Sequence, residues 1–338
     1  MRRGVLLPIL SLSLVLPAVA AGAGKTSWAQ PQIKLVTSHG LMGGEVSTFK
    51  PDSPLTQNAL ADLVAGLTEA TPTTPASPDA SVTIAALDST LVRTLGLRDA
   101  AAAFVRGART AGVTPPTRFG TEAVARLLGL RTNHPTGQDS LELLPNDAAT
   151  RAETAFSAAR ILALGDWDTE GVRNEALSFE LPELTAWQRK ILKTAVSFIG
   201  YPYIWGGTSE NPQTPLGVDT PGGFDCSGFV WRVYKLQGYA GAPQLNTVLK
   251  GRTTMQMSGE VPKNERIKLA DLQPGDVLFF GSRGPKSKPA QVDHTGIFLG
   301  GGWFIHSSGF GVALARLDGW YASGFAWARR PLAEAGLG

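Results

Sequence analysis

The 338-residue sequence contains one cysteine, Cys226, so the chain cannot form an internal disulfide. Zinc binding is disfavoured as well, because Cys226, His294 and His306 include no closely spaced pair of the kind that zinc sites use. No cofactor is indicated. The candidate reactive side chains are therefore the single thiol and the four histidine imidazoles.

Concentrated positive charge and long apolar runs are also missing. The 31 basic residues are scattered and the net charge is only +3, so a nucleic-acid-binding surface is not supported. No stretch approaches the 18 consecutive apolar residues that would predict a membrane span. A hydrophobic content of 43% over this length is ample for two domains with separate cores.

The N-terminal residues have the pattern of a secretory signal. Arg2 and Arg3 precede an apolar stretch over residues 4–16, and small residues follow Pro17. We expect residues 1–23 to be removed and the protein to be secreted, extracellular or associated with the cell wall, the alternative being an uncleaved anchor. An unpaired thiol is a liability in an oxidising compartment, so a functional role for Cys226 is favoured over a buried structural one.

Residues 33–165 are rich in alanine and leucine and predict an all-α domain. Three amphipathic helices are expected over residues 56–67, 99–111 and 150–164, and Thr56 and Thr150 are suited to cap two of them. Glu153 follows Thr150 at capping-box spacing. Periodicity is lost over residues 166–183, which are expected to connect this domain to the next.

Two capped segments resemble S-layer homology modules, which hold bacterial proteins to secondary wall polymers. The first copy is Gly40 to Gly44 with Phe49 to Thr56, the second is Leu144 to Glu153, and residues 87–128 would hold a degenerate middle copy. The resemblance implies a wall-polymer partner, although Gln57 replaces the expected arginine in the first copy. An all-α domain with ordinary helix caps and no ligand is the alternative.

In residues 184–332 the sequence predicts helices first and short strands after them. A helix is expected over residues 184–199 and another from Cys226, followed by β-rich runs over residues 276–280, 295–299 and 303–306 separated by glycine turns. Helices followed by strands indicate an α+β domain with a small antiparallel sheet.

The residues around Cys226 suit acyl transfer. Asp225 is a good N-cap, which places Cys226 at a helix N-terminus, where a lowered thiol pKa and an amide N–H available to an oxyanion are expected. His294 opens a strand, and a hairpin through Gly300 to Gly302 would bring it to His306 as base and orienter. Taken singly, His306 could be a core histidine and His294 a turn residue.

The same segments resemble the NlpC/P60 family of papain-like cell-wall peptidases. The motifs stand in the family order over about Leu184 to Arg330: 201–207, 225–229, 272–280, 294–300 and 304–307. The resemblance implies a Cys-His-His triad of Cys226, His294 and His306, and hydrolysis of the γ-D-glutamyl-diamino acid bond in peptidoglycan stem peptides. It implies no metal and no organic cofactor.

Family members that recognise a free N-terminal L-alanine use a tyrosine and the residues flanking the cysteine, which implies Tyr203, Asp225 and Ser227 here. Tyr201 is the alternative tyrosine, and Asp225 and Ser227 could instead be a helix cap and a packing residue. Two other functions stay open at this point. One is an amidase or acyltransferase on a wall or lipid substrate, and the other is a non-catalytic wall-binding scaffold.

Overall fold

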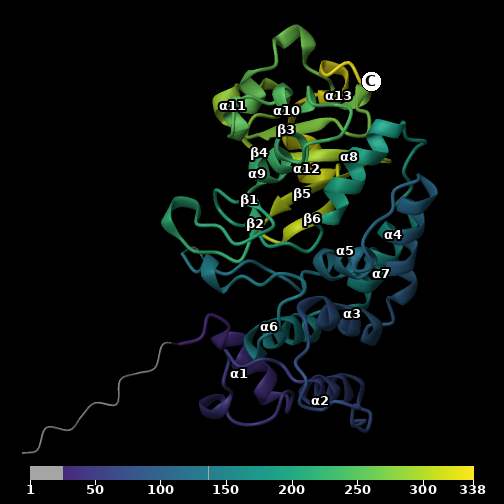
Figure 1. Cartoon of the computed structure of the whole chain (residues 1–338). Coiled ribbons are helices and arrows are strands. Elements are labelled where there is room, and N and C mark those ends of the chain that lie inside the picture. The colour runs from purple at the N-terminus through teal and green to yellow at the C-terminus, as the bar shows by residue number, and fades with distance from the viewer. Residues whose placement is uncertain (1–25, 136) are drawn as a thin grey trace, which may run out of the picture.

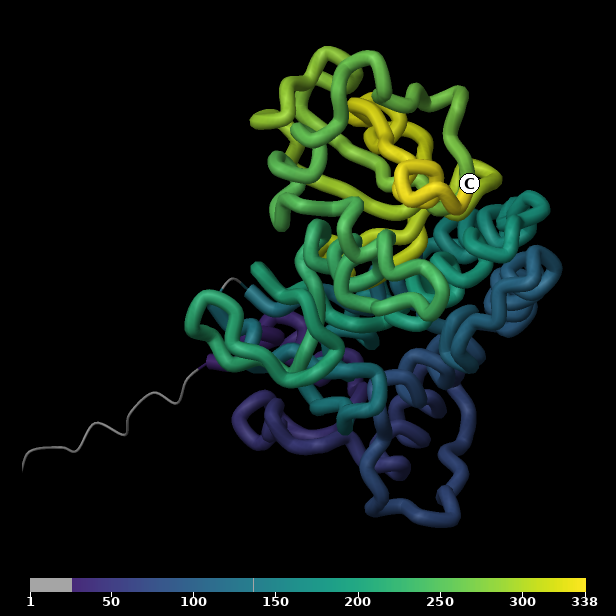
Figure 2. The backbone as a smooth tube through the Cα atoms, turned by 45° about the horizontal axis from the view of Figure 1, so that its top comes forward, coloured from purple at the N-terminus to yellow at the C-terminus, as the bar shows by residue number. Residues whose placement is uncertain are grey.

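The computed structural model describes residues 26–135 and 137–338, so the predicted signal segment 1–23 lies outside the described residues. A helical region from α1 onward occupies the lower part of the molecule, and the sheet with its covering helices occupies the upper part (Figure 1). A second view preserves this division of the chain into two packed parts (Figure 2). None of the helices in the described ranges is long and apolar enough to cross a membrane.

The helical region contains seven α-helices over the described residues. They are α1 Gln30–Ser38, α2 Gln57–Thr68, α3 Ile84–Thr94, α4 Arg98–Thr110, α5 Phe119–Leu127, α6 Arg151–Leu162 and α7 Asp166–Leu177. The helices predicted over residues 56–67, 99–111 and 150–164 are confirmed as α2, α4 and α6. The all-α character of the region is confirmed as well.

Three threonines start helices in the same way. Thr56, Thr83 and Thr150 each accept a hydrogen bond from the backbone N–H three residues ahead, at 3.1–3.2 Å. Short antiparallel bridges join the segments around them, Pro54 with Thr150, Thr56 with Ser81 and Thr83 with Ala148. The three capped segments are therefore joined to one another in pairs, and the middle one is capped by Thr83, four residues before the segment 87–128 in which the sequence resemblance would put a middle copy.

Most of the predicted connection over residues 166–183 is helix α7. Asp168 caps this helix by accepting from the Gly165 N–H at 2.8 Å. Only Val172 and Ala176 of α7 are buried, so its apolar face is too narrow to give clear periodicity in the sequence. Beyond α7, the Phe179 ring packs 5.1 Å from Phe104 and 5.4 Å from Trp303, which joins the two parts of the molecule.

The second part is an α+β domain, as predicted. Helix α8 spans Ala186–Ser197, and the short helices are α9 Cys226–Trp231, α10 Leu245–Val248, α11 Thr254–Gly259, α12 Gly319–Gly324 and α13 Pro331–Glu334. The main strands are β3 Val277–Gly281, β4 Val292–Gly300, β5 Trp303–Ser308, β6 Gly311–Arg316 and β7 Phe325–Arg329, and a two-residue pair comprises β1 Thr208–Ser209 and β2 Gly223–Phe224. The five main strands form an antiparallel sheet in the order β6-β5-β4-β3-β7.

The sheet is buried on both faces, because strand side chains alternate between two cores. Phe279 and Ile297 point into the main core with α9, while Phe280 and Phe304 belong to a smaller cluster on the opposite face that α12 helps to cover. Burial is close to complete at Cys226 on α9 and at His306 on β5, whereas at the start of β4 Asp293 is exposed and His294 is half-buried.

Candidate active site

Cys226 is the first residue of α9, as the sequence predicted. Asp225 caps the helix, since its side chain accepts from the Gly228 N–H. Gly228 is required for close packing, because a Cβ there would lie 1.9 Å from the Gly207 carbonyl oxygen. The Cys226 N–H, at the first helical position, has no helical carbonyl to bond and can serve an external oxyanion.

His294 and His306 meet across neighbouring strands. Strands β4 and β5 form a hairpin with Ile297 opposite Ile305, and this register brings the two imidazoles together with 2.7 Å between His294 Nε2 and His306 Nδ1. The hairpin expected from the Gly300–Gly302 turn is therefore present. His306 is almost fully buried, with 3% of its surface exposed.

The thiol lies against the start of β4. Cys226 Sγ is 3.9 Å from the Asp293 carbonyl oxygen, and the backbone N–H groups of Ser227 and Thr295 also approach the sulfur. His294 lies between Asp293 and Thr295, so its backbone borders the sulfur. Because His306 occupies Nε2 of His294, Nδ1 is the nitrogen left to exchange a proton with the thiol.

An aromatic enclosure surrounds the two histidines. The Tyr321 ring on α12 lies edge-on to His306 at 5.3 Å, Phe304 lies 4.8 Å from His306, and Phe280 lies 5.8 Å from His294. No sequence pattern indicated Tyr321, because it follows the histidines in the chain and reaches them only through packing. The enclosure buries His306 almost completely and leaves His294 half-buried.

Burial governs protonation in this region. It lowers the pKa of His294 to about 4 and places the pKa of His306 well below its ordinary value. Burial, together with the Asp225 carboxylate, raises the pKa of Cys226 to about 12. The expectation of a lowered thiol pKa is therefore wrong, because desolvation and the adjacent Asp225 carboxylate outweigh the positive potential at the helix N-terminus.

The raised thiol pKa predicts slow alkylation near neutrality. With iodoacetamide, the rate at Cys226 is expected to rise about tenfold per pH unit from pH 7 to 10, because the thiolate fraction grows as pH approaches the pKa. Mass spectrometry of the intact chain measures this without background from other thiols. A rate that is already pH-independent at pH 7 would instead show a thiolate held at neutral pH.

Asp225 and Ser227 lie in a polar cluster organised by Arg252. The Arg252 guanidinium contacts Asp225 Oδ2 at 3.0 Å and donates to Ser227 Oγ at 2.7 Å, and Ser227 in turn donates to Asp225 Oδ1 at 2.9 Å. Asp225 is thus both a helix cap and part of an ion pair. The pairing of Arg252 with Asp225 could not be read from the sequence.

The two candidate tyrosines have different surroundings. Tyr203 forms a parallel bridge with Phe224, which immediately precedes Asp225 in the chain, and burial together with Cys226 and Asp225 raises the pKa of its phenol. Tyr201 packs instead on Phe198 and Phe224, with both ring centroids 5.9 Å away. Tyr203 therefore accompanies Asp225 and Ser227, while Tyr201 contributes to the core.

Nothing in the described ranges resembles a metal centre, since no three His, Cys, Asp or Glu side chains there converge in a suitable geometry.

Sequence comparisons identify two segments. Residues 200–330 match the NlpC/P60 family, and residues 23–59 match the S-layer homology domain. A probable endopeptidase of Mycobacterium tuberculosis is 33% identical over 122 residues, covering 36% of this chain and 24% of that protein. A γ-D-glutamyl-L-lysine dipeptidyl-peptidase of Bacillus subtilis is 29% identical over 124 residues, covering 37% of this chain and 33% of that protein.

Solved structures match less than half of the chain. An NlpC/P60 family protein from Bacillus cereus is 27% identical with a TM-score of 0.33, covering 45% of this chain and 42% of that one. The NlpC/P60 domain of the peptidoglycan hydrolase SagA is 30% identical with a TM-score of 0.30, covering 42% of this chain and 97% of that one. The matched segments make up a third or less of the two curated relatives' own length. Residues 200–330 of this chain are thus an NlpC/P60 segment, preceded by a helical region whose first part matches the S-layer homology domain.

Proposed function

We propose that this protein is a secreted cysteine endopeptidase that hydrolyses the γ-D-glutamyl-diamino acid bond of peptidoglycan stem peptides. The observation that carries the proposal is the placement of the chain's one thiol at the start of β4, beside His294, whose Nε2 is held by His306 at 2.7 Å. A nucleophile, a base and an orienting group in this order constitute an acyl-transfer centre.

The proposed reaction begins from a neutral thiol and a neutral imidazole. As Sγ attacks the carbonyl carbon of the γ-glutamyl amide, its proton passes to His294 Nδ1, and the Cys226 N–H stabilises the oxyanion. The imidazolium then protonates the departing amine, leaving a thioester. Water, deprotonated by His294, hydrolyses the thioester and restores the thiol. His306 keeps the His294 ring in position throughout.

Recognition of the peptide N-terminus is assigned to Tyr203, Asp225 and Ser227. A phenol oxygen, a carboxylate and a hydroxyl are all acceptors for an ammonium group. The Arg252 contacts hold the carboxylate and the hydroxyl in one orientation, which favours a ligand with a fixed amine position such as a stem peptide with free L-alanine.

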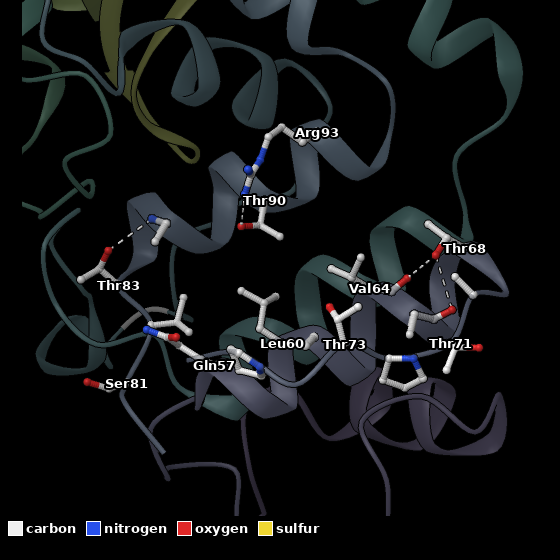
Figure 3. Close-up of a pocket in the computed structure, with 17 residues that line it drawn as sticks. Gln57, Leu60, Val64, Thr68, Thr71, Thr73, Ser81, Thr83, Thr90 and Arg93 are labelled. Carbon is white, nitrogen blue, oxygen red and sulfur yellow. Dashed lines mark hydrogen bonds between the residues drawn. The ribbon is translucent and has the colours of Figure 1, made fainter. Parts of the chain in front are cut away.

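Wall targeting is assigned to the helical region. A cavity of about 560 Å³ lies between α2, α3 and the Pro/Thr loop over residues 70–75. Its apolar floor includes Leu60 (Figure 3). Polar side chains surround this floor: Gln57, Arg93, Thr68, Thr71 and Thr83. Hydroxyls, one amide and one guanidinium over a small apolar surface suit a saccharide with an anionic group, which supports a secondary wall polymer as partner.

Both parts of the proposal are tested with the wild-type chain. Free stem peptides, purified walls and walls stripped of secondary polymer are digested and the products identified by mass spectrometry. We expect a cut between glutamate and the diamino acid in free peptides, and slower release from stripped walls than from intact ones. No cut in any substrate would contradict the endopeptidase, and equal release from both walls would contradict polymer targeting.

A further inference from the structure

We infer that Asn133, which belongs to the helical region, is a positioning residue for peptide binding in the NlpC/P60 domain. Both polar atoms of its side-chain amide form hydrogen bonds with the main chain of Tyr203. Asn133 Nδ2 donates to the Tyr203 carbonyl oxygen at 2.9 Å, and Asn133 Oδ1 accepts from the Tyr203 N–H at 3.3 Å. The inference rests on the proposed function, since it assigns Asn133 a role in presenting Tyr203 to the peptide amine.

The residues on either side of Asn133 are anchored in buried ion pairs. Arg131 contacts Asp88 at 3.0 Å and Glu153 at 2.6 Å, and His134 Nε2 lies 3.0 Å from Glu153. These side chains are almost fully buried and lie in the helical region. The backbone around Asn133 is therefore held in place by these ion pairs, so the position of its side chain relative to Tyr203 is fixed.

Further hydrogen bonds join the helical region to the NlpC/P60 domain near Tyr203. The Asn133 N–H donates to the Gly309 carbonyl oxygen at 2.9 Å. From α5, Arg126 donates to the Gly200 carbonyl oxygen at 2.7 Å and also to that of Phe310. Two chain segments of the NlpC/P60 domain, at residues 200–203 and 309–310, are thus hydrogen-bonded to the helical region.

Tyr203 lies between this contact and the nucleophile. It forms a parallel bridge with Phe224, two residues before Cys226. A shift of the Tyr203 main chain would therefore displace its phenol relative to Asp225 while leaving the His294–His306 pair in place. Loss of the Asn133 side chain should weaken the binding of peptides with a free amine and spare the chemical step.

The test uses the full chain with Asn133→Ala, and Asn174→Ala on the exposed surface of α7 as the matched control. For a stem peptide with a free N-terminal amine, KM is expected to rise about tenfold with kcat changed less than twofold, since two hydrogen bonds that place Tyr203 are lost. For the N-acetylated peptide, KM should not change. Asn133→Asp, which keeps only the acceptor, should give an intermediate KM.

The exchange rate of the Tyr203 amide hydrogen tests the role of Asn133 independently of peptide cleavage. The Tyr203 amide is expected to exchange at least tenfold faster in Asn133→Ala than in the wild type, whether or not any peptide is cleaved. Unchanged exchange, or a KM that rises equally for free and acetylated peptides, would overturn the inference. Absence of cleavage by the wild type would contradict the endopeptidase alone, because the exchange measurement still decides the role of Asn133.

Discussion

Cys226→Ala is expected to lower kcat for stem-peptide cleavage by roughly four to six orders of magnitude, the usual loss when a covalent nucleophile is removed. No other thiol exists in the chain to replace it. Binding of the peptide should persist, because Tyr203, Asp225 and Ser227 are unchanged. Single-turnover kinetics with calorimetric measurement of peptide binding would separate the two quantities.

The two histidines should differ in their effects. His294→Ala is expected to cost about as much as Cys226→Ala, and the double variant no more than either, because base and nucleophile act as one unit. His306→Ala should cost less, since it acts through His294 Nε2. His39→Ala, in the exposed C-terminal cap of α1, is the matched control. Residual activity of more than about one per cent in Cys226→Ala would rule out the covalent mechanism.

Arg131→Met is expected to lower the free energy of unfolding by about 3–5 kcal/mol, because it leaves the buried Asp88 carboxylate without its cation, while Glu153 keeps His134 as a partner. Arg131 holds both Asp88 and Glu153, and its own exposure is only 4%. The variant would leave two buried carboxylates with their shared cation removed. No comparable loss is expected from Arg109→Met on the exposed end of α4.

The size of this loss should depend on pH. Burial raises the pKa of Asp88 to about 6, so Asp88 is largely ionised at pH 8 and largely protonated at pH 5. A protonated Asp88 needs no cation, and Arg131→Met should therefore destabilise the protein less at pH 5 than at pH 8. Denaturant unfolding at the two pH values measures the difference. A loss below about 1 kcal/mol at pH 8 would show that the cluster is hydrated or rearranges.

Much of the proposed catalytic centre follows from local sequence chemistry. Asp225 caps the helix that starts at Cys226 because a carboxylate there satisfies free backbone N–H groups. The apolar runs after His294 and up to His306, joined by three glycines, can form only a tight hairpin, and such a hairpin places the two imidazoles side by side. These features involve residues close together in the chain, and they were predicted.

Contacts between distant segments were not predictable in the same way. Helix α7 buries only two residues, so its pattern resembles that of a loop. Arg252, Tyr321 and Asn133 reach the site from 26 residues or more away from Cys226, and nothing in their local sequence indicates a partner. The thiol pKa was predicted with the wrong sign, because the helix N-terminus is a local property whereas burial is a property of the packed whole.

Residue identity and short-range order are thus enough to predict an α+β domain with a helical region ahead of it, and to propose a Cys-His-His centre on that domain. Packing decides the burial of that centre, the polar groups around it and the hydrogen bonds by which the helical region holds Tyr203. Desolvation and hydrogen bonding act through space over a few ångströms, and residues separated by a hundred positions come that close only after the chain has folded.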